Sequence, residues 1–132
     1  MSTLTANLHL MMTSFYKPTR ERFKIICEAK AFPSDRVRHC DLERGSLTDA
    51  PLKYAFHSQA RLHGFEPSDA VIEVLPRVGE YTLREEDILS VIKQHSSSIA
   101  LVLFPGVQYY TGQWFPIEAI TQAGHTEVRN SR

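Results

Sequence analysis

The sequence predicts an α/β fold built on a mainly parallel sheet. Three short apolar segments, at residues 23–28, 71–75 and 99–104, have the length and composition of strands. Helical periodicity lies between and around them, and strands that alternate with helices are typical of a parallel sheet. The segment 99–104 is apolar throughout, which predicts a strand buried on both faces. Sheets of this kind usually have more strands, so we expect the chain to supply part of a larger sheet.

The first helix is predicted over Leu4–Phe15, where apolar residues recur at helical spacing. Ser2, Thr3 or Thr5 could cap its start, because a hydroxyl oxygen accepts a bond from an amide of the first turn. Pro18 follows the segment, and proline cannot continue a helix.

Three more helices have recognisable ends. Pro51 suits the start of a helix that Gly64 would end. Residues 82–85, Thr-Leu-Arg-Glu, form a capping box that would open the next helix. Pro116 would start a last short helix, with Gly124 as its stop.

The composition indicates an ordinary globular protein. Among 132 residues, 15 are Lys or Arg and 15 are Asp or Glu, so the formal net charge is zero with neutral histidines. This balance gives no electrostatic reason to expect nucleic acid or an anionic membrane as a partner. The longest apolar run is too short to span a bilayer, and the first residues lack a signal-peptide pattern. We therefore expect a cytoplasmic protein.

No residue pattern predicts a metal site or a common catalytic motif. Cys27 and Cys40 lack CxxC spacing, and the six histidines form no HxH or HExxH pair. A GxSxG elbow, a Walker lysine and a GxGxxG loop are also missing from the sequence. No metal ligand is therefore predicted.

Three segments could bind a ligand, and each has a simpler structural explanation. The helix start Leu4–Thr5 could bind a phosphate, but nearly every helix offers such a start. The segment Phe32–Asp35 follows a strand, where open α/β sheets bind ligands, and its ring could stack on a heterocycle. An ordinary turn with a core aromatic explains it as well. The loop 104–112, with two glycines and two tyrosines, could be a binding loop or a well-packed turn.

Taken together, four ordered segments resemble kynureninases, most closely eukaryotic and in particular fungal members. The resemblance covers residues 1–36 and 54–124, and four blocks in order are far more specific than any one of them. The segments are Leu4–Met12 (LTANLHLMM), Lys30–Asp35 (KAFPSD), Ser58-Gln59 with Leu62-His63-Gly64, and Phe104–Gln113 (FPGVQYYTGQ).

This resemblance implies a pyridoxal-phosphate enzyme of the aspartate-aminotransferase-like fold type I. The whole of residues 1–132 would then be part of its three-layer α/β/α large domain, truncated at both ends. Kynureninase is a cytoplasmic homodimer that hydrolyses L-kynurenine or 3-hydroxy-L-kynurenine to anthranilate or 3-hydroxyanthranilate and L-alanine. It is a hydrolase that acts on a C–C bond, in tryptophan catabolism and NAD biosynthesis.

The resemblance also assigns residues to the pyridoxal 5'-phosphate. The start of the first helix would lie at the cofactor phosphate, and an aromatic ring would stack on the pyridine. The residues that carry over are Leu4, Thr5, Phe32, Pro33, Ser34 and Asp35. Relatives often have a hydroxyl residue where this chain has Pro105, and proline offers neither hydroxyl nor N–H, so that contact is not carried over.

The Schiff-base lysine of the family has no counterpart in this sequence. In the family it lies downstream beside a tyrosine, and the same holds for the aspartate and histidine that hold the ring. None of the five lysines has that context: Lys17, Lys24, Lys30, Lys53 and Lys93. We therefore predict no catalytic residue here and expect these residues alone to be inactive. A non-catalytic pseudoenzyme and a mis-spliced gene-model fragment are the alternatives.

Two stretches depart from the family pattern. Val37–Lys53 has no sustained apolar period and separates two blocks that relatives join almost directly. It could be a retained intron, since valine codons begin with GT and one lysine codon ends in AG. A lineage-specific loop insertion is the alternative, because surface loops tolerate added length. Residues 125–132 are predicted to be a tail foreign to the family.

Overall fold

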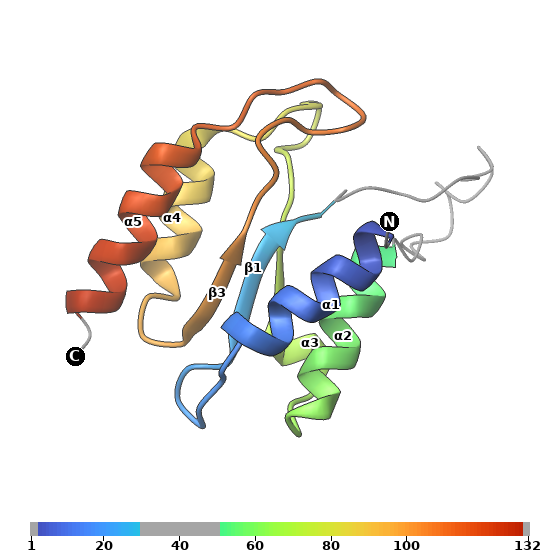
Figure 1. The fold of residues 1–132 in the computed structure, drawn as a ribbon. Helices are drawn as coiled ribbons and strands as arrows, with labels where there is room; N and C mark the ends of the chain where they lie inside the picture. The colour runs from blue at the N-terminus through green and yellow to red at the C-terminus, as the bar shows by residue number, and fades with distance from the viewer. Residues whose placement is uncertain (1–2, 30–50, 131–132) are drawn as a thin grey trace.

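A three-stranded parallel sheet lies at the centre of the structure, a computed structural model that describes residues 3–29 and 51–130 (Figure 1). The strand order is β2-β1-β3, and both strand pairs are parallel. The predicted α/β fold class is therefore confirmed. The elements are α1 (Leu4–Phe15), β1 (Lys24–Glu28), α2 (Pro51–Leu62), α3 (Pro67–Ala70), β2 (Val71–Val74), α4 (Glu85–Gln94), β3 (Ile99–Leu103) and α5 (Ile117–Asn130).

The central strand is β1, and it is the most deeply buried of the three. Its residue Ile25 lies opposite Val71 of β2 on one side and Leu101 of β3 on the other. In β3, only Ile99 is buried and the following four residues are half-buried. The strand packs against the apolar cores on both faces, as predicted. Its burial is incomplete because, within the described residues, β3 is an edge strand that pairs with β1 alone.

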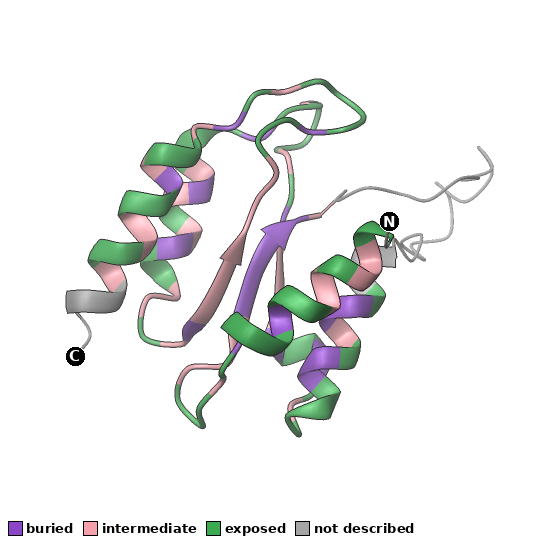
Figure 2. Ribbon diagram, viewed as in Figure 1, coloured by how far each residue is buried: buried purple, intermediate pink, exposed green. Residues whose placement is uncertain are grey.

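Helices cover both faces of the sheet, which gives three layers (Figure 2). Side chains of a strand alternate between faces. Ile26 accordingly packs with residues of α4 and α5, whereas Ile25 and Cys27 pack with residues of α1 and α2. The two faces thus have separate apolar cores that meet at β1.

Helix α1 has the predicted bounds, and the structure settles which residue caps it. The Thr3 hydroxyl accepts a hydrogen bond from the Ala6 amide at 3.2 Å. At the other end Tyr16 is buried, and its hydroxyl donates to the carbonyl oxygen of Phe23 at 2.6 Å. This bond joins the end of α1 to the start of β1 across the turn that Pro18 opens.

Two predicted helix ends are wrong and one is confirmed. Gly64 follows α2 with a φ of +81°, as a helix-ending glycine should. Helix α4 begins at Glu85 and Arg84 occupies the N-cap position, so Thr82 does not cap it. Leu83 lies outside the helix, and both its backbone groups bond to the Gln113 side chain. Helix α5 continues past Gly124 to Asn130, because a glycine is compatible with helical backbone and nothing there requires a turn.

Helix α3 was not predicted from the sequence. It has four residues, too few to show a helical period, and it leads directly into β2. In the described ranges, no helix combines the length and the apolar character that a bilayer crossing requires.

Candidate functional site

The carboxyl ends of the three strands and the start of α1 lie at the same end of the molecule (Figure 1). Parallel strands necessarily end at one edge of a sheet. Helix α1 precedes β1 and runs back along it, so its first turn reaches the edge where β1 ends. In open α/β sheets this is the edge at which ligands bind.

The first turn of α1 suits an anion. Thr3 bonds the amides of Ala6 and Asn7, through its hydroxyl and its carbonyl oxygen at 3.2 and 3.0 Å. The earlier amides, those of Leu4 and Thr5, have no acceptor within an α-helix and point out along its axis. The first turn contains no acidic residue that would compete for the positive end of the helix dipole.

The predicted site residues are only partly covered by the structure. Leu4 is 58% exposed and Thr5 is half-buried, so both can be reached at the helix start. Phe32, Pro33, Ser34 and Asp35 lie outside the described residues. Glu28 ends β1 at the carboxyl edge, a few residues before them.

The loop after β3, residues 104–116, is a well-ordered turn. The side-chain oxygen of the buried Gln108 accepts bonds from the amides of Tyr110 and Thr111, each at 2.6 Å, and from the Thr111 hydroxyl at 3.1 Å. Gly112 has a φ of +69°, a conformation that favours glycine, and its amide bonds to the Gln108 carbonyl. Hydrogen bonds within the loop fix its shape, but among residues 106–112 only Gln108 is buried and both tyrosines are exposed. The binding-loop and packed-turn explanations therefore both remain predictions.

Gln113 ties this loop to the loop after β2, residues 75–84. Its side-chain oxygen accepts from the Leu83 amide at 2.8 Å, and its side-chain nitrogen donates to the Leu83 carbonyl. The side-chain amide of Gln113 thus bonds both the backbone N–H and the backbone C=O of Leu83, as a neighbouring β-strand would.

A buried carboxyl lies below this tie. Glu28 is 5% exposed, and burial raises its pKa to about 7. It lines a small, partly open cavity of about 20 Å³ at the carboxyl edge, together with residues of both loops. Sequence reasoning did not single out Glu28 or Gln113, although Gln113 belongs to a segment on which the family resemblance is based. Gln108 lies in the loop 104–112, which was considered as a candidate binding loop.

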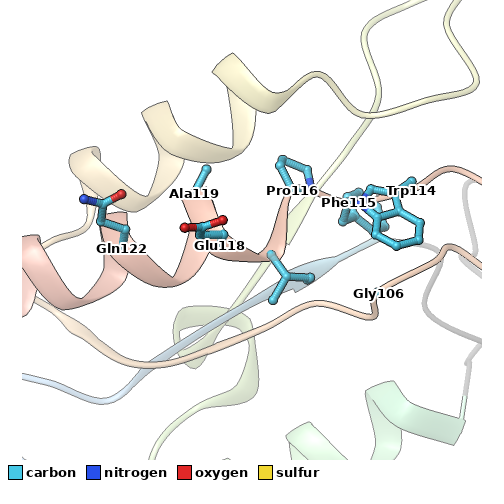
Figure 3. A pocket seen from close by; sticks show the side chains of 8 residues that line it. Gly106, Trp114, Phe115, Pro116, Glu118, Ala119 and Gln122 are labelled. Atoms are coloured by element: carbon cyan, nitrogen blue, oxygen red, sulfur yellow. The ribbon is translucent and has the colours of Figure 1, made fainter.

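A larger hollow, of about 470 Å³, lies at the start of α5 (Figure 3). Trp114 and Pro116 form apolar walls, and Glu118 and Gln122 lie along α5 beside it. Neither Leu4 nor Thr5, the two predicted cofactor residues that the structure describes, lines this hollow.

A partly buried polar pair joins α1 to α2. The Gln59 side-chain nitrogen lies 3.2 Å from Nδ1 of His9. Gln59 is buried, and its side-chain oxygen has no hydrogen-bond partner among the described residues. In the same described ranges, no three His, Cys, Asp or Glu side chains are grouped as metal ligands.

Comparison with known proteins finds relatives that match nearly the whole chain. The chain is 50% identical over 127 residues to a kynureninase of Flavobacterium psychrophilum, covering 96% of this chain and 26% of the relative. It is 53% identical over 123 residues to a kynureninase of Nematostella vectensis, covering 93% of this chain and 23% of the relative. The chain is similar to a segment of each of these kynureninases.

The match extends over nearly the whole chain but only part of each relative. A kynureninase of Rattus norvegicus is 50% identical over 127 residues, 96% of this chain and 24% of the relative. The chain therefore spans about a quarter of the length of the curated kynureninases it matches. The similarity is about as strong to the bacterial protein as to the two animal proteins, so it does not single out a fungal source. No protein-family model matches the chain.

Proposed function

We propose that this chain is a pyridoxal-phosphate-binding segment of a kynureninase large domain. The whole enzyme would hydrolyse L-kynurenine or 3-hydroxy-L-kynurenine, and this segment would supply the phosphate end of the cofactor site. The observation that carries the proposal is the first turn of α1, which meets the carboxyl edge of the sheet without an acidic residue. Identity of about 50% to kynureninases supports the same function.

The residues at the start of α1 fit a phosphate dianion. The amides of Leu4 and Thr5 would donate to phosphate oxygens, and the Thr5 hydroxyl adds a third donor. Phe32, Pro33, Ser34 and Asp35 are proposed to hold the pyridine ring. When bound, the cofactor supplies an electron sink for the substrate carbon. The role of this chain is to bind and orient that group.

A chimera tests the proposal. The matching segment of the rat kynureninase is replaced by this chain without residues 37–53, and hydrolysis of 3-hydroxykynurenine is measured against pyridoxal phosphate concentration. We expect a cofactor-dependent activity. Thr5→Val is expected to raise the half-activating cofactor concentration about tenfold or more, because a hydrogen bond to a charged group is lost. Thr13→Val, at the far end of α1, is the matched control. An inactive, folded chimera contradicts the proposal.

The stretch Val37–Lys53 is proposed to be an insertion foreign to the enzyme. Its last three residues form the first turn of α2, and the rest lies outside the described residues. A second chimera that keeps 37–53 is expected to lose most of the activity. Spliced transcripts that retain the stretch, or codons at 37 and 53 without GT and AG borders, contradict the retained-intron origin.

These 132 residues on their own are proposed to be inactive. None of the five lysines has the sequence context of the family's Schiff-base lysine. A pseudoenzyme or a mis-spliced fragment is the second candidate function, and the same lysine observation favours it. Pyridoxal phosphate added to the purified chain is expected to give no lysine-dependent absorption band and no turnover. A band that one lysine substitution abolishes would overturn this proposal.

A further inference from the structure

The strand order places the Gln113–Leu83 tie across the end of the central strand. The loop with Leu83 follows β2, and the loop with Gln113 follows β3. Because β1 lies between β2 and β3, a bond between these loops must cross over the carboxyl end of β1. We call this pair of hydrogen bonds the strap.

The loops at both ends of the strap are held by further hydrogen bonds. On one side Arg77, in the loop after β2, donates two hydrogen bonds to Asp87 of α4, at 2.9 and 2.7 Å. On the other side the backbone of Gln113 accepts from the Gln108 amide at 2.8 Å, inside the turn that Gln108 organises. The strap therefore joins two preformed loops.

The strap also covers the buried end of β1. Gln113 and Leu83 line the small cavity into which Glu28 faces. Leu83 belongs to the apolar core that β1 shares with α4 and α5. Loss of the strap would let the two loops separate over Glu28 without removing any residue of that apolar core.

We propose that Gln113 is a positioning residue, whose strap holds the two loops in the shape that the carboxyl edge needs to receive the cofactor. This inference rests on the proposed function of the same edge. Gln113 does not touch the anion site at α1, so its effect is on the geometry of the edge and not on the charge there.

The first arm of the test measures backbone amide exchange in the full chain. Gln113→Leu removes both hydrogen bonds, and Gln113→Glu keeps the acceptor for the Leu83 amide but removes the donor. We expect exchange at Leu83 to become at least tenfold faster in Gln113→Leu and to change less in Gln113→Glu, with β1 unaffected. Gln122→Leu, the same change at an exposed glutamine of α5, is the control. Unchanged exchange at Leu83 overturns the proposal.

The second arm measures cofactor dependence in the rat chimera. Gln113→Leu is expected to raise the half-activating pyridoxal phosphate concentration about tenfold, with kcat at saturating cofactor within twofold of the parent. Gln113→Glu is expected to recover part of the difference. Faster exchange with an unchanged cofactor requirement would make the strap purely structural and overturn the proposal. A parent chimera that is folded but inactive contradicts the proposed function instead, and the exchange arm then still decides whether the strap holds the loops.

Discussion

Glu28 gives the described part of the chain a clear pH dependence. Its pKa is raised by burial from the ordinary 4.5 to about 7. Between these values the folded chain holds a proton that the unfolded chain has released. The free energy of unfolding therefore falls as pH rises through this window, by at most about 1.4 kcal/mol per pH unit, and levels off above pH 7.

Glu28→Gln is expected to remove this dependence. The amide is neutral at every pH, so the variant should gain on the parent as pH rises from 5 towards 8. Urea unfolding at several pH values measures the difference. Glu21→Gln, at an exposed position, is the control and should keep the parent's pH profile. A Glu28→Gln profile parallel to the parent's would contradict a buried, protonated carboxyl.

Tyr16 offers a second test at the residue scale. Burial raises its pKa to about 12, so the hydroxyl stays protonated and remains a donor to the Phe23 carbonyl. Tyr16→Phe keeps the ring but leaves that carbonyl without its partner, and we expect a loss of about 1 kcal/mol in unfolding free energy. Tyr81→Phe, at an exposed tyrosine, should change stability by only a few tenths of that amount. Equal effects of the two variants would contradict the assignment.

Helix α1 contains two threonine side chains with different roles, one at its N-cap and one inside the helix. Thr3 caps the helix, so Thr3→Ala is expected to cost about 1 kcal/mol. Thr13 lies within the helix and bonds back to the His9 carbonyl at 2.9 Å, an arrangement that stabilises a helix little. Thr13→Ala is therefore expected to be neutral or slightly stabilising, since alanine is the better helix former. Thermal unfolding followed by circular dichroism measures both. A larger loss at Thr13 than at Thr3 would contradict the cap.

Local sequence patterns predict most helices and strands of this fold. They fail where contacts with residues distant in the sequence determine the local structure. Apolar runs at 23–28, 71–75 and 99–104 become β1, β2 and β3 with ends shifted by one residue at most. The capping box at Thr82 is wrong, because α4 begins at Glu85 and both backbone groups of Leu83 bond to the side chain of Gln113, 30 residues away, outside the helix. No local signal reports such a partner, and the strap was missed for the same reason. Of the site, the helix start at Leu4–Thr5 could be located from its capping residues, because capping is a local property.

The whole molecule has two exposed sheet edges within its described residues. β2 and β3 each pair on one side only, with β1. Unpaired strand edges pair readily with other chains. Exposed apolar side chains add to this tendency, among them Val78, Tyr81, Tyr110 and Trp114.

We expect the isolated 132-residue chain to self-associate with rising concentration, up to about 100 μM, in analytical ultracentrifugation. The Trp114→Ser variant tests whether strand edges or exposed aromatic side chains drive the association. Most of the self-association should remain in this variant, because the strand edges contribute backbone groups that no side-chain change removes. A chain that stays monomeric over this range contradicts the prediction, and full dissociation by Trp114→Ser would assign the association to the aromatic surface.

The bond between Tyr16 and Phe23 has a consequence at the opposite end of the molecule. Helix α1 has 12 residues and is therefore about 18 Å long, with this bond at one end and the proposed phosphate site at the other. Because of this length, a tilt of α1 by about 5° about its Tyr16 end moves the first turn by about 1.5 Å. Errors of about 1 Å in the placement of a reacting group are costly to an enzyme. We therefore expect the turn between α1 and β1 to set the alignment of the proposed phosphate site.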